Sequence, residues 1–322
     1  MDYAIGIDLG GTHLRAALVD RAGTIVAHQR IRTHAAEGAE AVIARIFDLI
    51  GTVQAAQPGA TIRGVGIAAP GPLNPETGMV ITMPNLPGWD NFPLRDRIAA
   101  KLPFPVVLGN DANLAAVGEW RFGGGKAMQN LIYVTISTGI GGGIISDGHL
   151  LLGHNGLAAE VGHMVLDFDG PTSGSAGVEG SWEALASGTA LARQAAKAMQ
   201  AGTTTILHDL ATPETVSTRH IQQAAEAGDE YANALIAKAG RWCGVAFVSL
   251  LHLFSPEAIF VGGGVSINLG ERILAPARAE IRERALPGYR NVPIIVTNLG
   301  DNIGLLGAAA YVFENERLGT KD

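Results

Sequence analysis

The sequence has very little cysteine, with Cys243 alone among 322 residues. A single cysteine excludes an intrachain disulfide and any zinc site built from several thiolates. A secreted scaffold held by disulfides is therefore excluded, and a reducing cytoplasm is the predicted location. The first residues also lack a basic segment followed by an apolar one, so no secretory signal is predicted.

Positive charge is scarce as well, because 23 Lys and Arg residues stand against 30 Asp and Glu residues, a formal net charge of −7. Without a bulk positive field we expect no nucleic-acid partner. The uncharged helical run at residues 242–256 is shorter than the roughly 20 residues of a membrane span. We therefore expect a buried core helix there, and no membrane partner.

Glycine is plentiful, at 43 residues, but shows no three-residue period, which excludes collagen. Three predicted apolar strands end in glycine turns, at residues 10–12, 138–143 and 262–264. Such turns can present backbone N–H groups to a phosphate, although any one alone is weak evidence and favours packing over a ligand. Together they favour a nucleotide whose phosphates touch several loops. The P-loop pattern is absent, which excludes a P-loop, and a dinucleotide fingerprint is not convincing, which disfavours a nicotinamide enzyme.

The order of predicted elements repeats along the chain. A three-stranded meander at residues 3–31 precedes a helix at 35–57, and strands then alternate with helices up to residue 121. A similar order recurs from residue 131, with helices predicted at 269–284 and 304–318, among others. Two α/β halves around a cleft are therefore expected. We predict a small lobe over 1–118, with the segment 304–322 packing back on it, and a large lobe over 119–303.

Two acidic residues follow predicted strands. Asp8 ends the first strand and could hold magnesium through water. Asp111 follows Asn110 between a strand and a helix, where ligand groups gather in open α/β sheets. From its position alone, Asp111 is more simply interpreted as an N-cap and nothing more.

Four further polar residues are candidates with ordinary structural alternatives. Glu160 and His163 lie three residues apart and would share one side of a helical turn. Glu183 could simply favour a helix dipole, and Asn85 could serve a turn.

These glycine turns and polar residues, in this order, resemble those of the ROK family of repressors, open reading frames and kinases. The resemblance extends over nearly the whole chain. The matching segments are Asp8–Thr12, Gly64–Pro72, Asn85–Trp89, Asn110–Asn113, Thr138–Gly143, Glu160–His163, Glu183–Gly188 and Gly262–Gly264. The resemblance implies a two-lobed, actin-like (ribonuclease-H-like) α/β fold with ATP at the glycine turns and a sugar in the cleft.

The resemblance also implies roles for single residues. Asp111 would be the catalytic base. The residues that would hydrogen-bond the sugar are Asn85, Asn110, Asp111, Glu160, His163 and Glu183. The residues that would approach ATP and its Mg²⁺ are Asp8, Gly10, Gly11, Thr12, Thr138, Gly139, Gly262, Gly263 and Gly264.

The sequence departs from the family pattern in two places. His13 stands where Lys is usual after the first turn. Gly174, Ala176 and Ser181 occupy the three cysteine positions of a metal motif found in many members. Because neutral hydroxyls bind zinc weakly, no zinc site is expected.

The predicted activity is that of an ATP-dependent hexose kinase, most closely a glucokinase, and the resemblance suggests a homodimer. Kinases for N-acetylmannosamine, fructose or mannose are alternatives within the family. A sugar-responsive repressor would need an additional helix-turn-helix domain, for which the first strand, at about residue 3, leaves no room. A catalytically inactive sensor is disfavoured because Asp8 and Asp111 are both retained.

Overall fold

The computed structural model describes residues 1–83, 86–173 and 177–318. The chain forms two compact units. Unit 1 comprises Met1–Tyr133, Gly143–Ala159 and Thr297–Asp322, and unit 2 comprises Val134–Gly142 and Glu160–Val296. The lobe boundaries at residues 118 and 303 stay a prediction.

The first sheet belongs to unit 1 and has the strand order β3-β2-β1-β4-β7. Its strands are β1 (Asp2–Leu9), β2 (His13–Asp20), β3 (Ile25–Arg32), β4 (Thr61–Ala69) and β7 (Val106–Asn110). The first three are antiparallel neighbours, which confirms the predicted meander. Strands β4 and β7 run parallel to β1. The carboxyl ends of β1, β4 and β7 therefore meet at one edge of the sheet.

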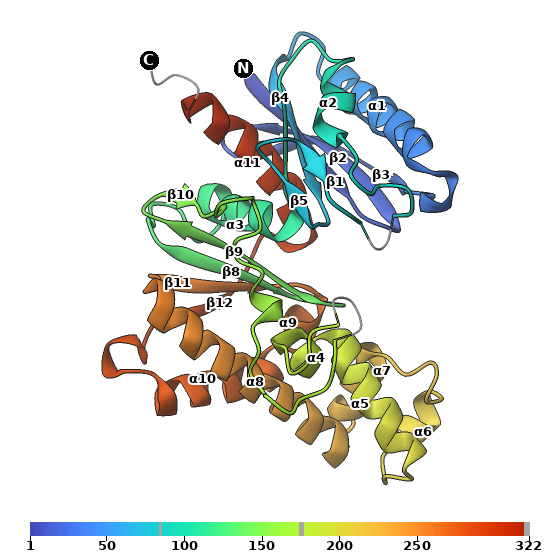
Figure 1. Cartoon of the computed structure of the whole chain (residues 1–322), viewed down its shortest axis with the longest axis vertical. Coiled ribbons are helices and arrows are strands. Elements are labelled where there is room, and N and C mark those ends of the chain that lie inside the picture. The colour runs from blue at the N-terminus through green and yellow to red at the C-terminus, as the bar shows by residue number, and fades with distance from the viewer. Residues whose placement is uncertain (84–85, 174–176, 319–322) are drawn as a thin grey trace. The chain divides into compact units, whose positions relative to one another are not determined.

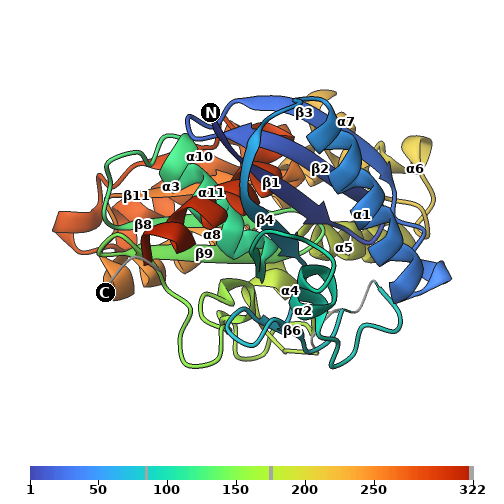
Figure 2. The same ribbon diagram turned by 90° about the horizontal axis from the view of Figure 1, so that it is seen from above.

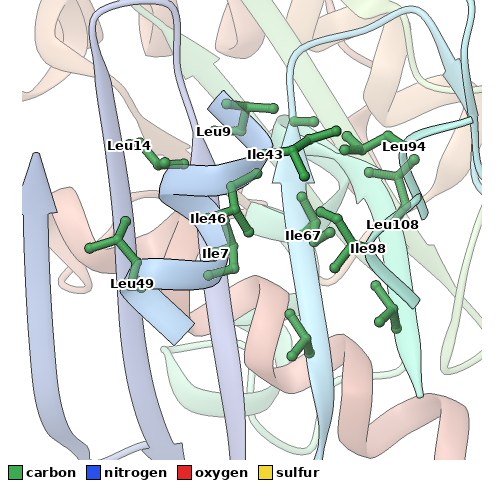
Figure 3. Packing of buried hydrophobic residues seen from close by; sticks show 14 of the residues in the cluster. Ile7, Leu9, Leu14, Ile43, Ile46, Leu49, Ile67, Leu94, Ile98 and Leu108 are labelled. Atoms are coloured by element: carbon green, nitrogen blue, oxygen red, sulfur yellow. The ribbon is translucent and has the colours of Figure 1, made fainter. Parts of the chain in front are cut away.

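One face of this sheet is covered by helix α1 (Ala39–Ala55), which follows the short 3-10 turn η1 (Ala35–Glu37). Its buried residues recur at helical spacing, as the sequence predicts. Figure 3 shows Ile43 and Ile46 of α1 beside apolar side chains of β1, β2 and β4. Helix α2 (Leu94–Ala99) adds Leu94 and Ile98 near β7. Figure 2 shows α1 lying across the strands of this sheet.

The opposite face is covered by helix α11 (Ile303–Leu318), which also packs against α3 (Asp111–Phe122). Figure 1 shows α11 running alongside β1 and β4. A Cβ atom on Gly66 of β4 would overlap the carbonyl oxygen of Ala308. A Cβ atom on Gly307 would in turn overlap the carbonyl oxygen of Leu114 in α3. Glycine is therefore required where the helix backbone meets its neighbours.

The second sheet has the order β10-β9-β8-β11-β12. Its strands are β8 (Leu131–Ile136), β9 (Ile140–Ser146), β10 (His149–Leu150), β11 (Ala258–Gly262) and β12 (Ile294–Val296). A separate two-stranded ribbon pairs β5 (Leu73–Asn74) with β6 (Met79–Val80). The remaining helices are η2 (Val161–His163), α4 (Trp182–Ala186), α5 (Gly188–Gln200), α6 (Leu207–Leu210), α7 (Thr218–Glu226), α8 (Glu230–Phe254), α9 (Gly264–Leu269), α10 (Glu271–Arg284), η3 (Pro287–Tyr289) and η4 (Gly300–Asn302).

The predicted helix 269–284 is wrong at its start. Gly270 has a positive φ of 51°, and its N–H donates to the carbonyl of Ser266. This geometry ends α9 and lets α10 begin at Glu271, since glycine tolerates a backbone that other residues avoid. The third glycine turn thus opens the short helix α9, which the sequence analysis did not anticipate.

Helix α8 is long and apolar enough to cross a membrane by length and composition. It nevertheless packs along α10, and 56% of its most apolar 18-residue window is buried in the fold. Buried positions such as Cys243 and Phe247 repeat along its inner face. The helix therefore has the contacts of a core helix, as the run at 242–256 predicts.

Candidate active site

The first glycine turn, Gly10–Thr12, joins β1 to β2 and is held by Thr33. The Thr33 hydroxyl donates to the carbonyl of Gly10 at 2.6 Å, and its backbone N–H donates to Thr12 at 3.0 Å. Gly10 itself donates to the carbonyl of His13 at 3.0 Å. The turn is therefore held by the start of β2 and by the residue that follows β3.

Asp8, just before this turn, forms an ion pair with Arg15. The Arg15 Nε atom donates to Oδ2 of Asp8 at 2.9 Å, and Nη2 also contacts that oxygen. Nη1 of Arg15 donates to the carbonyl of Asp301 at 2.7 Å. The guanidinium thus orients the Asp8 carboxylate at the carboxyl end of β1.

Asn110 and Asp111 lie at the same edge of the sheet, with β4 between them and β1. The side-chain oxygen of Asn110 accepts from the N–H groups of Ala112, at 3.0 Å, and Asn113, at 3.3 Å. Asn110 is therefore the N-cap of α3, and the interpretation of Asp111 as that cap is wrong. Asp111 is the first helical residue, where the positive end of the helix dipole favours a carboxylate.

The second glycine turn joins β8 to β9 in unit 2 and is bound to the start of α5. The carbonyl of Thr138 accepts from the hydroxyl of Thr189 at 2.9 Å and from its N–H at 3.2 Å. Gly188 donates to the carbonyl of Ser137 at 2.8 Å. Turn and helix N-terminus are therefore joined into one corner, in which the N–H groups of Gly188 and Thr189 are bonded to the turn.

A pocket of about 800 Å³ opens beside this corner. Its wall includes Thr138 and Gly264, two of the residues predicted to bind the nucleotide. Gly262 and Gly263 do not line it: Gly262 is the buried last residue of β11, and Gly263 packs against the end of β8. The remaining lining includes Gly188, Thr189, Val216–His220, Gln222 and Asn268.

Residues 216–220, Gln222 and Asn268 line the pocket although no sequence motif marks them as ligand-binding. Ser217 before a helix start was a readable capping signal, but nothing in it pointed to a ligand. The pocket forms because α5, α7 and α9 converge on one strand end, which only the tertiary structure provides.

Glu160 and His163 lie together at the turn η2, with Oε2 of Glu160 3.9 Å from Nε2 of His163. Burial raises the pKa of Glu160, while His163 lowers it and Glu183 raises it. The Nδ1 atom of His163 is buried and lacks a hydrogen-bond partner among the described residues. Asn85 lies outside the described residues.

Glu183 opens α4, whose N-cap is Ser181, and faces the second glycine turn. Its Oε2 atom accepts from the N–H of Ile140 at 3.0 Å. A Cβ atom on Gly139 would clash with the same carboxylate oxygen. Next to Glu183, the buried indole of Trp182 packs edge-on against Phe247, with ring centroids 5.5 Å apart. Trp182 thus anchors the helix that places Glu183.

The loop leading to Ser181 is closed by main-chain hydrogen bonds. Trp182 donates to the carbonyl of Met164, and Leu166 to that of Gly180, both at 2.8 Å. In the ranges that the structure describes, no three His, Cys, Asp or Glu residues gather as a metal site. Gly174 and Ala176 lie outside those ranges, and Cys243 is buried within α8, where burial raises its pKa to about 12. The described residues therefore do not fit a zinc site.

Residues 4–315 match the ROK family, which extends over almost the entire chain. The chain belongs to the ROK family. A glucokinase from Streptomyces coelicolor is 39% identical to this chain, and the match covers 96% of this chain and 97% of that protein. A xylose repressor from Caldicellulosiruptor bescii is 32% identical, covering 97% of this chain and 78% of the repressor.

Among ROK structures, a glucokinase from Streptomyces griseus in complex with glucose and AMPPNP superposes with a TM-score of 0.81. It is 35% identical, and the match covers 97% of this chain and 99% of that one. The predicted actin-like α/β fold of this ROK protein is thereby confirmed.

Proposed function

We propose that this protein is an ATP-dependent hexose kinase that transfers the γ-phosphoryl group of ATP to O6 of glucose. The observation that carries the proposal is the pocket beside the second glycine turn, whose volume lies in the range of small-molecule sites and whose wall carries several polar side chains. The likeness to a glucokinase structure that holds glucose and AMPPNP supports the same choice. A reducing cytoplasm and a homodimer belong to this proposal as expectations from composition and family.

In the proposed reaction Asp111 is the catalytic base. The glucose O6 oxygen attacks the γ-phosphorus in line, the bond from that phosphorus to the β,γ-bridging oxygen breaks, and ADP leaves. The O6 proton passes to the carboxylate of Asp111. Since phosphoryl transfer needs little covalent help, the other residues chiefly position the two substrates.

The sugar-binding residues of the proposal are Asn85, Asn110, Glu160, His163 and Glu183, together with Asp111. Side-chain oxygen and nitrogen atoms of this kind bind sugar hydroxyls through paired donors and acceptors. Asn110 already uses its oxygen to cap α3, so its amide N–H₂ group is the part assigned to the sugar.

The nucleotide-binding residues of the proposal come from the three glycine turns. Gly10, Gly11 and Thr12 would approach the phosphates, as would Thr138 and Gly139. Gly262, Gly263 and Gly264 are assigned to the nucleoside side, and in the pocket wall Gly264 is joined by residues 216–220 and Asn268.

Asp8 is the residue that would hold Mg²⁺, through water. A single carboxylate fits this ion, which keeps most of its waters and takes its other ligands from substrate phosphates. Bound there, Mg²⁺ would neutralise charge on the phosphates. Arg15 orients the carboxylate for that role.

We predict that Asp8→Asn raises the Mg²⁺ concentration needed for half-maximal activity at fixed ATP, because the neutral amide binds the ion less well. Titrating Mg²⁺ in a coupled ADP-release assay measures the shift. The matched control is Asp2→Asn on the same strand, which also breaks ion pairs, here with Arg21 and Arg63. Equal Mg²⁺ curves for Asp8→Asn and the control would contradict the assignment.

We predict that protein purified without added metal contains well under one zinc per chain. The loop before Ser181 is held by main-chain hydrogen bonds and the buried Trp182 rather than by several thiolates. Chelator treatment should therefore abolish activity only by removing Mg²⁺, and excess Mg²⁺ should restore it. Stoichiometric zinc in elemental analysis, or chelator-induced unfolding that Mg²⁺ fails to reverse, would show the expectation to be wrong.

The proposed function is tested by measuring ADP release with Mg-ATP across a panel of sugars. Glucose should be phosphorylated at O6 faster than N-acetylmannosamine, fructose or mannose. Preference for another sugar would move the assignment within the family. ATP and glucose binding without turnover would instead favour a sugar-responsive regulator.

A further inference from the structure

Ile140, the first residue of β9, is contacted by Glu183 and by Gly162 of η2. Glu183 accepts a hydrogen bond from the N–H of Ile140 at 3.0 Å. At the next peptide group, Gly162 approaches so closely that a Cβ atom there would overlap the carbonyl oxygen of Ile140. Gly162 lies between Glu160 and His163 in η2. The glycine turn therefore contacts both η2 and α4, the elements that carry the side chains assigned to the sugar.

Two residues, Gly139 and Ser181, allow the contact between Glu183 and the glycine turn. Gly139 leaves room for the carboxylate, because a Cβ atom at that position would clash with Oε2. Ser181 caps α4 by accepting from Ala184 at 3.2 Å, which fixes the first turn of the helix and with it Glu183. An acidic side chain on a backbone N–H is a charge-assisted hydrogen bond, stronger than a neutral one.

The same short stretch continues into the wall of the nucleotide pocket. Helix α4 ends at Ala186, and Ser187 caps α5 by accepting from Ala190 at 3.1 Å. Thr189, in the first turn of α5, then donates to the carbonyl of Thr138. The segment 181–189 therefore touches the glycine turn at both of its ends, once through Ile140 and once through Thr138.

We propose that Glu183 is a positioning residue that couples the two substrates: its carboxylate holds the second glycine turn in place for the phosphates while it binds the sugar. A sugar hydroxyl that orders this carboxylate also orders the Ile140 N–H bond, so each ligand strengthens the binding of the other. Such coupling is reciprocal by thermodynamic necessity. The inference rests on the proposed function for the identity of the two ligands.

The test measures the dissociation constant of Mg-AMPPNP by calorimetry, with and without saturating glucose. In the wild type, glucose should tighten AMPPNP binding by about fivefold or more, the low end of typical couplings. Glu183→Ala should weaken AMPPNP binding about ten- to a hundredfold even without glucose, the effect of losing one hydrogen bond to a charged group. It should also abolish the effect of glucose.

Two further variants separate positioning from simple sugar contact. Glu183→Gln keeps an oxygen that can accept from Ile140, so it should recover most of the sugar-free AMPPNP affinity while glucose binding stays weak. Glu160→Ala removes a sugar-binding residue that has no hydrogen bond to the turn among the described residues. It should weaken glucose binding and leave the sugar-free AMPPNP affinity unchanged.

Wild-type AMPPNP affinity in Glu183→Ala without glucose would overturn the inference, leaving Glu183 a sugar contact only. Equal losses in Glu160→Ala and Glu183→Ala would overturn it too, because general loosening of the unit would then explain both. A Gly139→Ala variant gives an independent check, since its methyl group should displace the Glu183 carboxylate and likewise remove the effect of glucose. If wild-type protein binds neither glucose nor AMPPNP, the proposed function fails. If the wild-type protein binds both ligands and phosphorylates glucose, but the Glu183 variants lose only glucose affinity, the inference alone fails.

Discussion

Asp111→Asn should lower kcat by about 10²–10⁴-fold while glucose binding is largely retained, the range typical of removing a general base. Asparagine keeps the shape of aspartate and can still accept the hydrogen bond that Ala112 donates to Oδ1 at 2.8 Å. Since Asn110 rather than Asp111 caps α3, the helix start should survive the change. Only the capacity to take the O6 proton is lost.

The measurement compares kcat from a coupled ADP-release assay with the glucose dissociation constant from calorimetry. Asp48→Asn is the matched control, because Asp48 is an exposed residue of α1 with no proposed role in the reaction. It should retain wild-type kcat. A near wild-type kcat in Asp111→Asn would mean that another group accepts the proton.

Gly66→Ala should destabilise the protein by roughly 1–3 kcal/mol or more, as overpacking of a closely packed core does. The added methyl group would overlap the carbonyl oxygen of Ala308, which is helix backbone and cannot rotate away. Helix α11 would have to move off β4. The midpoint and slope of urea unfolding, followed by circular dichroism, measure the loss.

Gly51→Ala is the matched control, with an expected effect of opposite sign. Gly51 lies inside α1, and no atom is within 4 Å of the Cβ position. Alanine in an exposed helix interior is favoured over glycine by roughly 0.5–1 kcal/mol. The same substitution should therefore stabilise the chain at residue 51 and destabilise it at residue 66. Equal effects at the two sites would contradict the close approach of α11 to β4.

The ROK assignment and the predicted locations of the phosphate turns were available from the sequence. The glycine turns at residues 10–12 and 138–143 each follow a predicted apolar strand, and glycine after a strand is a local signal that needs no tertiary information. The amphipathic pattern of α1 and the opening meander were predicted for the same reason. Local sequence fixes these features because backbone sterics and side-chain spacing act over a few residues.

Other features depended on contacts between distant segments. The sequence could not tell that Asn110 rather than Asp111 would cap α3, because both residue types suit that position. It shows no sign that residues 216–220 and Gln222 would line one pocket with Thr138, which results from the packing of α5, α7 and α9.

The hydrogen bond between Glu183 and Ile140 is the clearest example of a contact that local sequence could not predict. The two residues are 43 positions apart, and the motif order alone assigned Glu183 to the sugar without any link to the phosphate turn. Sequence patterns determined the type and order of the elements and the chemistry of single side chains. The tertiary structure decided which side chain completes which turn, because long-range pairing depends on how whole helices and strands pack.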